Sequence, residues 1–207
     1  AIPYSPTTPV TTDWVISLMN LQLPPGTRVQ FQRGVPIDVS RNTLVRSAQE
    51  NKAAFIFFLD ADVLAPPDIV TRLMARKVPI VSGVYWSKKG YPAVWEQHPS
   101  GRGFTPIKHL PEQGLTEVAG ISMGCSLIDM RTFSCIPDPW FEWGLRDPRK
   151  EGEGEGHSED LTFCKKASEA GFKLFVDPAV RCLHESVVPV NVDGEMKFTE
   201  AQREKVA

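Results

Sequence analysis

The stretch Phe55-Ile-Phe-Phe-Leu-Asp60-Ala-Asp62-Val63 joins an apolar run to two acidic residues. Residues 53–59 form a near-continuous apolar segment of strand length, which is typical of a parallel strand buried on both faces. Side chains alternate between the two sides of an extended segment, so Asp60 and Asp62 are predicted to project to the same side. Both follow the end of the strand, and ligands of open α/β sheets bind beyond the carboxyl ends of strands.

This carboxylate pair predicts a divalent metal site. Two carboxylates held close together repel each other unless a cation lies between them. Mg²⁺ or Mn²⁺ commonly combines one or two carboxylates with the phosphates of a substrate. The alternative is structural, because aspartates are common in turns: Asp60 would then cap a turn, and Asp62 or Asp68 would start the next helix.

Strands and short helices alternate on both sides of this stretch. The alternation predicts a doubly wound α/β fold with a mostly parallel central sheet, flanked by helices. Shorter strands and Gly/Pro turns in residues 92–130 predict a small antiparallel extension. The predicted strands are residues 1–4, 28–32, 53–59, 80–85, 174–176 and 180–183, and the predicted helices start at Thr12, Ser40, Pro66 and Ser158.

Length and composition are those of a single globular domain. The chain has 207 residues, and we expect one domain over residues 1–207 with a polar tail from about residue 189. The net charge of −2 does not indicate a basic surface that would bind nucleic acid. No apolar run is long enough to span a bilayer and no signal peptide is evident, which favours a soluble, cytoplasmic protein. The four cysteines lack a C-x-x-C pair and are expected to be reduced and structural. Composition does not indicate an oligomeric state.

Four motifs follow one another in an informative order. They are Asp38-Val-Ser-Arg41-Asn42, Asp60-Ala61-Asp62, the Ser158-Glu159-Asp160-Leu161 segment with its later Ala170-Gly171-Phe172, and His184-Glu185. Their order and spacing resemble the "aRN", DxD and "ED … aG … H" segments of nucleotide-sugar glycosyltransferases with the GT-A fold, of the family-2 type. The resemblance covers residues 2–185. Each motif alone is weak evidence, and the ordered set is more specific.

The resemblance implies a nucleotide and metal site. Asp60, Asp62 and His184 would hold the cation, and an imidazole among oxygen ligands favours Mn²⁺ over Mg²⁺. A lone histidine is more often structural, which is the alternative for His184. The implied nucleotide-binding residues are Pro3, Tyr4 (packing on the base), Asp38 (accepting hydrogen bonds from base or ribose), Arg41 (base or phosphate), Asn42 and Ala61.

The resemblance also implies a catalytic base. In the inverting enzymes of this kind, the Asp of the "ED" pair takes the proton from the acceptor hydroxyl, which assigns the role to Asp160 with Glu159 as the second candidate. Acidic residues in a first helical turn also interact favourably with the helix dipole, which is the structural alternative. An inverting outcome is favoured, and a retaining one stays open because the fold serves both.

Three further segments complete the candidate site. Gly120 and Gly124 would let the backbone pass close beneath the donor sugar, or would mark a strand bend. Trp86 and Lys88 would meet the donor sugar and diphosphate, or form a solvated basic turn.

Residues 147–156, with Arg149, Lys150 and the following His157, are predicted to be a flap over the donor. Surface disorder explains their composition equally well. The aromatic residues just before this stretch would form either an acceptor platform or part of the core: Trp140, Phe141 and Trp143.

The sequence therefore predicts a metal-dependent enzyme that transfers a sugar from a UDP- or GDP-sugar to an acceptor hydroxyl. The acceptor is left open among a glycan, a lipid and a small molecule. One alternative is a phosphatase of the haloacid-dehalogenase type, in which Asp60 attacks phosphorus and Asp62 shuttles protons. A nucleotidylyltransferase is disfavoured because its Gly-rich basic loop is absent. A binding module for sugar nucleotides without turnover is the non-enzyme alternative.

Overall fold

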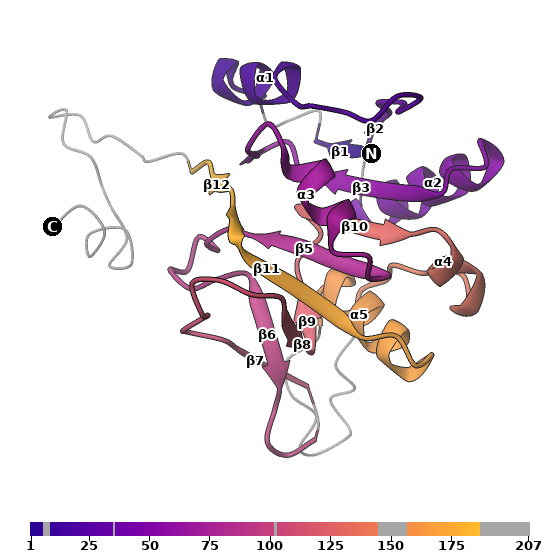
Figure 1. Cartoon of the computed structure of the whole chain (residues 1–207). Helices are drawn as coiled ribbons and strands as arrows, with labels where there is room; N and C mark the ends of the chain where they lie inside the picture. The colour runs from indigo at the N-terminus through magenta and orange to yellow at the C-terminus, as the bar shows by residue number, and fades with distance from the viewer. Residues whose placement is uncertain (6–8, 35, 102, 145–156, 187–207) are drawn as a thin grey trace, which may run out of the picture.

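The computed structural model describes residues 1–5, 9–34, 36–101, 103–144 and 157–186, and is an α/β structure (Figure 1). Its main sheet has five strands. In spatial order they are β3 (Phe55–Leu59), β10 (Cys125–Asp129), β5 (Ile80–Val84), β11 (Leu174–Arg181) and β8 (Thr116–Val118). Smaller sheets pair β1 (Ile2–Tyr4) with β2 (Phe31–Arg33), β4 (Val63–Leu64) with β12 (Leu183–His184), and β6 (Val94–Gln97) with both β7 (Phe104–Pro106) and β9 (Gly120–Ile121).

The main sheet is mixed, so the prediction of a mostly parallel sheet was wrong. β10 is antiparallel to both of its neighbours, β3 and β5, and β8 is antiparallel to β11. Only β5 and β11 pair in parallel in this sheet. β10 is buried along its whole length, like a central parallel strand. A continuous apolar run reports burial on both faces and carries no information about strand direction.

The antiparallel extension was therefore predicted only in part. β6, β7 and β9 form a separate antiparallel sheet within residues 92–130. β8 and β10, from the same stretch, join the main sheet instead. β1 lies beside β3, since the backbone N–H of Leu59 donates to the carbonyl of Ala1 at 3.1 Å. The N-terminal strand thus extends the edge of the sheet next to the acidic pair.

Helices cover both faces of the sheet and enclose two apolar cores. One core lies against α2 (Ile37–Glu50), α4 (Arg131–Cys135) and α5 (Glu159–Glu169), and the other against α1 (Thr12–Met19) and α3 (Ile69–Ala75). Neighbours on one strand divide between the two, as Phe58 and Leu59 do on β3. Within the described ranges, no helix combines the length and apolar character needed to cross a bilayer.

Several element boundaries differ from the predicted ones for local reasons. α2 begins three residues before the predicted Ser40 and so includes Asp38 in its first turn. Thr11, one residue before the predicted cap, accepts the capping hydrogen bond of α1 from the N–H of Trp14. Ser158 caps α5 as predicted. The two strands expected between residues 174 and 183 form one strand, β11, whose register shifts between Val176 and Arg181.

Close packing of β5 on β11 gives a stability prediction. A Cβ at Gly83 would lie 2.9 Å from the carbonyl oxygen of Val180, which is backbone and has little room to move. We expect Gly83→Ala to lower the free energy of unfolding by about 1–3 kcal/mol, the usual cost of overpacking, measured by urea denaturation. Gly34→Ala is the matched control, since its Cβ would meet only Ser40 Oγ at 3.5 Å. Equal stability of both variants would contradict this account of the strand pair.

Candidate functional site

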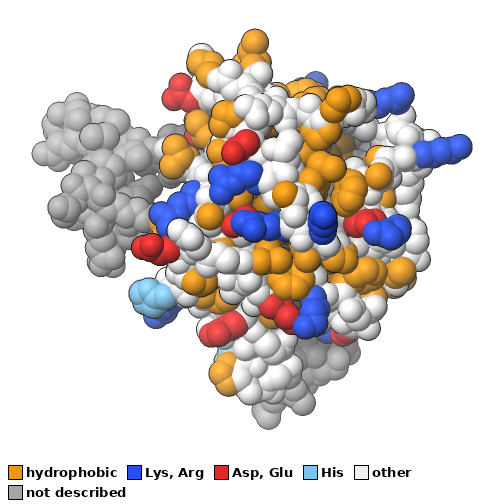
Figure 2. Space-filling view, viewed as in Figure 1, with side chains coloured by type: hydrophobic (Ala, Val, Ile, Leu, Met, Phe, Trp, Pro, Cys, Tyr) orange, Lys and Arg blue, Asp and Glu red, His pale blue; other side chains and the backbone are white. Residues whose placement is uncertain are grey.

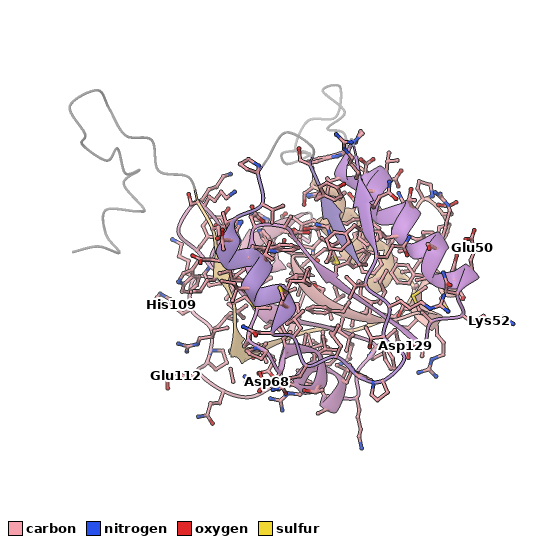
Figure 3. The ribbon with its side chains drawn as sticks, turned by 90° about the horizontal axis from the view of Figure 1, so that it is seen from above. Glu50, Lys52, Asp68, His109, Glu112 and Asp129 are labelled. Atoms are coloured by element: carbon pink, nitrogen blue, oxygen red, sulfur yellow. The ribbon has the colours of Figure 1, made fainter. Side chains whose placement is uncertain are left out.

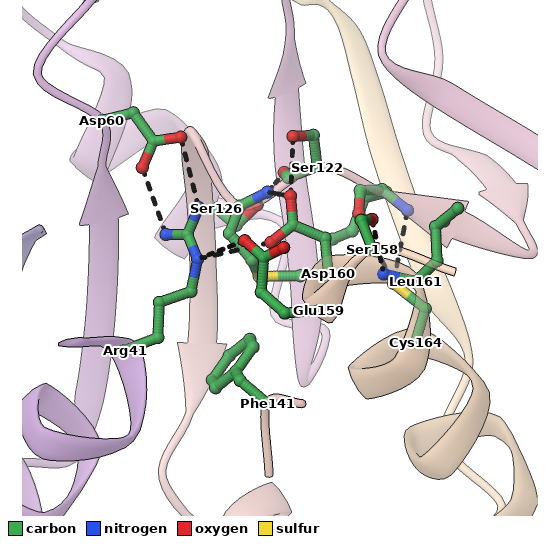
Figure 4. A network of polar contacts seen from close by, with 12 residues as sticks. Arg41, Asp60, Ser122, Ser126, Phe141, Ser158, Glu159, Asp160, Leu161 and Cys164 are labelled. Atoms are coloured by element: carbon green, nitrogen blue, oxygen red, sulfur yellow. Dashed lines mark hydrogen bonds and ion pairs between the residues drawn. The ribbon is translucent and has the colours of Figure 1, made fainter. Parts of the chain in front are cut away.

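A buried arginine organises the site at the end of β3 (Figure 4). Arg41 is 2% exposed and lies in the second turn of α2. Its Nη1 and Nη2 lie 3.1 and 3.2 Å from the two carboxylate oxygens of Asp60. Its Nε lies 3.4 Å from Glu159 and 3.3 Å from Asp160. One guanidinium therefore connects three acidic residues from two distant segments of the chain.

The three acids outnumber the one cation that they surround. If all were ionised, Arg41 at +1 and three carboxylates at −1 each would give the cluster a net charge of −2. Burial, followed by the charge of Asp160, raises the pKa of Glu159 to about 8. Burial alone would lower the pKa of Arg41, but the charge of Asp60 and then those of Asp160 and Glu159 outweigh burial and raise it. At neutral pH, Arg41 is thus charged and Glu159 retains its proton.

Asp160 is held at the start of α5 by a second set of contacts. Its Oδ2 accepts hydrogen bonds from Ser122 Oγ at 2.9 Å and from the backbone N–H of Met123 at 3.1 Å. Ser122 Oγ in turn accepts a hydrogen bond from Tyr85 at 2.6 Å. The sequence analysis did not identify Ser122 or Tyr85. Ser122 lies between the two predicted glycines, Gly120 and Gly124, but nothing in the residue pattern indicates which carboxylate it meets.

Asp62 takes a different set of partners from Asp60. Its Oδ2 lies 3.0 Å from Lys88 Nζ and 3.2 Å from His184 Nε2. The prediction that the two carboxylates project to the same side assumed an extended segment. Residues 60–63 instead form a turn, in which the N–H of Val63 donates to the carbonyl of Asp60 at 3.1 Å. Asp60 consequently faces Arg41, and Asp62 faces the lysine and histidine.

Both nitrogens of His184 face hydrogen-bond acceptors. Nδ1 lies 2.8 Å from the carbonyl oxygen of Trp86, and Nε2 lies 3.2 Å from Asp62. A neutral imidazole has one N–H, so the two contacts require either an imidazolium or a cation between Nε2 and the carboxylate. Burial lowers the pKa of His184, but the hydrogen bonds to Asp62 and to the Trp86 carbonyl outweigh it and raise that pKa. For Asp62, burial acts in the opposite direction and raises the pKa. The hydrogen bonds from His184 and Lys88 outweigh burial and lower the pKa of Asp62 below its ordinary value.

The Asp62 and His184 pair fits two ligands of one metal ion. Donor atoms at right angles around Mn²⁺ or Mg²⁺, each about 2.1–2.2 Å from it, lie about 3 Å apart, close to the 3.2 Å between Nε2 and Oδ2. The predicted third ligand, Asp60, has its carboxylate on Arg41 instead. Among the described residues, no group of three or more His, Cys, Asp or Glu side chains is arranged to hold a metal. Of the three predicted ligands, Asp62 and His184 thus lie together and Asp60 does not join them.

The residues predicted to bind a nucleotide differ in whether the protein already occupies their side chains. Tyr4 ends β1 and meets Phe31 edge to face with ring centroids 6.3 Å apart, while Asp38 keeps a buried Oδ1 without a hydrogen-bond partner. Asn42 is engaged within the protein, since its side chain donates to the carbonyl of Phe141 at 2.7 Å and accepts from its N–H at 3.1 Å. Asn42 therefore positions the residues before α5 rather than facing a ligand. The remaining two lie in the strand and turn around the site: Pro3 and Ala61.

The two predicted glycines make room for protein side chains. A Cβ at Gly124 would lie 2.5 Å from the hydroxyl of Tyr85, and one at Gly120 would lie 2.6 Å from Leu161. Both glycines are buried, and their predicted passage beneath a donor sugar stays a prediction. Trp86 is 45% exposed beside the Asp62 pair.

The aromatic residues before α5 divide between the core and the surface. Trp140 and Phe141 are buried, and Phe141 stacks on Phe163 with ring centroids 4.8 Å apart, so core packing accounts for both. Trp143 is 51% exposed. His157 packs edge to face on Phe104 at 5.2 Å. The other predicted flap residues, Arg149 and Lys150, lie outside the described residues.

Comparison with known proteins gives a similarity in fold. No protein-family model matches the chain, and no curated protein matches it. Among solved structures, the fold is similar to that of A197 from STIV, with a TM-score of 0.58. The match covers 96% of this chain and 92% of that one, at 15% sequence identity. At this identity, the similarity shows the fold alone.

The raised pKa of Glu159 gives a prediction for stability against pH. Glu159 binds its proton more tightly in the folded than in the unfolded protein, so the benefit is full below pH 4.5 and is lost as pH rises to about 8. Relative to Glu159→Gln, the native protein should lose roughly 2–4 kcal/mol of unfolding free energy between pH 5 and pH 8. Urea denaturation at the two pH values measures this difference. Glu169→Gln, an exposed change on the same helix, should behave like the native protein; parallel pH profiles for native and Glu159→Gln protein would contradict the proton assignment.

Proposed function

We propose that the protein is a metal-dependent glycosyltransferase with the GT-A fold, which takes a sugar from a nucleoside-diphosphate sugar. The observation that carries the proposal is the convergence of four separate motifs at the end of β3. Arg41 meets Asp60, Glu159 and Asp160, and Asp62 meets His184. Residues from α2, the turn after β3, α5 and β12 would thereby supply one site with a charged anchor, buried carboxylates and a pair of metal donors.

Asp38 and Tyr4 suit the nucleoside end of the donor. The buried, unpartnered Oδ1 of Asp38 is an acceptor that needs an N–H or O–H donor, such as those of a nucleobase or ribose. Tyr4 offers an aromatic ring at the end of β1, next to that acceptor's helix. Asp38 Oδ1 and the ring of Tyr4 thus suit contacts with a ligand, whereas both polar atoms of the Asn42 side chain are already bonded to Phe141.

Asp62 and His184 would hold the metal, and the diphosphate of the donor would supply further oxygen ligands. When bound, Mn²⁺ or Mg²⁺ neutralises the charge that develops on the leaving diphosphate. Lys88 already lies 3.0 Å from Asp62 and adds a second cation on the phosphate side. Asp60 acts here as a positioning residue, because both of its oxygens are directed at Arg41.

Asp160 would act as the base toward the acceptor hydroxyl. Its carboxylate takes the hydroxyl proton, the hydroxyl oxygen bonds to the anomeric carbon, and the bond from that carbon to the phosphate oxygen breaks with its electron pair leaving on the diphosphate. Ser122, the Met123 N–H and Arg41 fix the orientation of this carboxylate. Glu159 holds a proton at neutral pH, which makes it the weaker candidate for this step.

The phosphatase alternative requires Asp60 to act as a nucleophile. A nucleophilic carboxylate needs an oxygen that faces the phosphorus atom, whereas Asp60 lies across the guanidinium of Arg41. His184 and Glu159 would also have no role in that chemistry. A binding module without turnover would retain the Asp62 and His184 pair and the buried Arg41 contacts, and would differ only in transferring no sugar. Release of UDP or GDP from the sugar nucleotide in the presence of an acceptor separates all three functions.

A metal test addresses the Asp62 pair. We expect EDTA to abolish transfer and Mn²⁺ to restore it, because the leaving diphosphate would otherwise be uncompensated. Asp62→Asn and His184→Gln should each weaken Mn²⁺-dependent binding of UDP or GDP by about tenfold or more, measured by thermal shift and calorimetry. Asp68→Asn, a change at an exposed aspartate after the same strand, is the control. Undiminished transfer in EDTA would remove the metal from the proposal.

A separate test addresses the base. Asp160→Asn keeps the shape of the side chain and removes its basicity, so transfer should fall by about a hundredfold or more while affinity for the sugar nucleotide persists. Glu159→Gln should retain most of the turnover at pH 7. Steady-state kinetics with each variant measure both effects. Near-normal turnover of Asp160→Asn would place the base elsewhere or indicate a retaining reaction.

A further inference from the structure

A pocket lies away from the acidic site. It has a volume of about 510 Å³, within the usual range for small-molecule pockets. Its walls come from the loop after α1, the end of α2, and the strands β1, β3 and β10. It shares no residue with the Arg41 cluster or the Asp62 pair.

The lining of this pocket is predominantly apolar and partly open to solvent. Leu18 lines it from the last turn of α1, and Leu21 and Leu23 line it from the segment that follows. Three of its lining residues are large hydrophobic side chains that remain exposed at 37–50%: Val29 at 48%, Phe55 at 40% and Met74 at 37%. In Figure 2, hydrophobic side chains gather over α1 at the top of the view and continue down its right half. Exposed apolar surface that lines a hollow indicates a binding site more strongly than scattered exposed residues.

The charged side chains of the lining are both cationic. Arg28 and Lys52 belong to the lining, and no Asp or Glu does among the described residues. Arg28 contacts the side-chain oxygen of Asn51, which also lines the pocket. Lys52 follows the C-terminal end of α2 and is exposed, and Figure 3 shows it at the periphery of the molecule near Glu50. An apolar hollow with two cations suits a ligand with a long apolar part and one anionic end.

We propose that this pocket binds the acyl chain of an anionic amphiphile, with its headgroup at Arg28 and Lys52. An unbranched chain suits the lining better than a sugar or nucleotide, because few polar groups of the lining are available to pair with hydroxyls. The cations distinguish the ligand from a neutral hydrocarbon. The source is either a free fatty acid or one lipid of a membrane. This site is independent of the proposed transfer reaction.

The experiment uses the full chain in EDTA without nucleotide, and titrates it with cis-parinaric acid, a fluorescent fatty acid. Saturable binding with one ligand per chain is expected, with displacement by dodecanoate, decanoate and octanoate. Each methylene removed should weaken binding by about fourfold, the value of a buried methylene. Dodecanol, which lacks the charge, should bind more weakly than dodecanoate. Sedimentation with vesicles of phosphatidylcholine and phosphatidylglycerol distinguishes a membrane lipid from a free acid.

Three variants locate the ligand. Leu21→Asp places a carboxylate in the lining and should abolish binding, whereas Met19→Asp, two residues earlier and 80% exposed outside the lining, should not. Ala48→Phe fills the hollow from α2 and tests the same point without adding charge. Arg28→Gln with Lys52→Gln should weaken dodecanoate binding about fivefold or more and leave dodecanol unchanged. Lys173→Gln is the charge control at an exposed lysine outside the lining.

Other outcomes would overturn the proposal. Absence of saturable binding, or equal loss of binding with Met19→Asp and Leu21→Asp, would exclude an acyl-chain site in this pocket. Sedimentation equilibrium that shows a dimer in the native protein and a monomer in Ala48→Phe would make a second copy of the chain the occupant. Each variant is checked for an unchanged thermal unfolding midpoint before titration, and the charge-neutral Ala48→Phe stands in if Leu21→Asp does not fold.

Discussion

The burial of the Arg41 guanidinium is the constraint on which the site depends. An isolated charge in the interior is costly, and it is tolerated only when carboxylates and good hydrogen-bond geometry compensate for lost hydration. Asp60 supplies two contacts, and Glu159 and Asp160 supply a third and a fourth. The same interaction therefore fixes α2 against β3 and α5. Lysine is a poor substitute because it lacks the planar fork that reaches partners on two sides.

The short turn after β3 divides the acidic pair between two tasks. Asp60 is directed inward to Arg41, and Asp62 is directed to Lys88 and His184. A strictly extended segment would have placed both carboxylates in one environment, where they would repel each other. The turn separates their partners while keeping them two residues apart. A buried ion pair at Asp60 and a more open contact between Asp62 and His184 can therefore coexist at one strand end.

The residue pattern was sufficient for most elements and insufficient for their pairing. Capping and periodicity located α5 and β3 closely, because those signals are local. The direction of β10 was not predictable from its apolar run, since burial on both faces looks the same in either direction. In the site, Arg41, Asp60 and Asp160 were identified by motif. Ser122 and Tyr85 were missed because their contacts span 38 and 37 residues and leave no periodic signal.

Two protein donors are too few to define a metal site by themselves. In the proposed enzyme, an ion held by Asp62 and His184 would need further oxygen ligands from water or phosphate. Its affinity for the protein alone is therefore modest, and a diphosphate that supplies additional oxygens raises it. By linkage, the metal raises the affinity for the diphosphate by the same factor. In the proposed enzyme, donor and metal would thus bind as a unit, beside a lysine, Lys88, that contacts Asp62 at 3.0 Å.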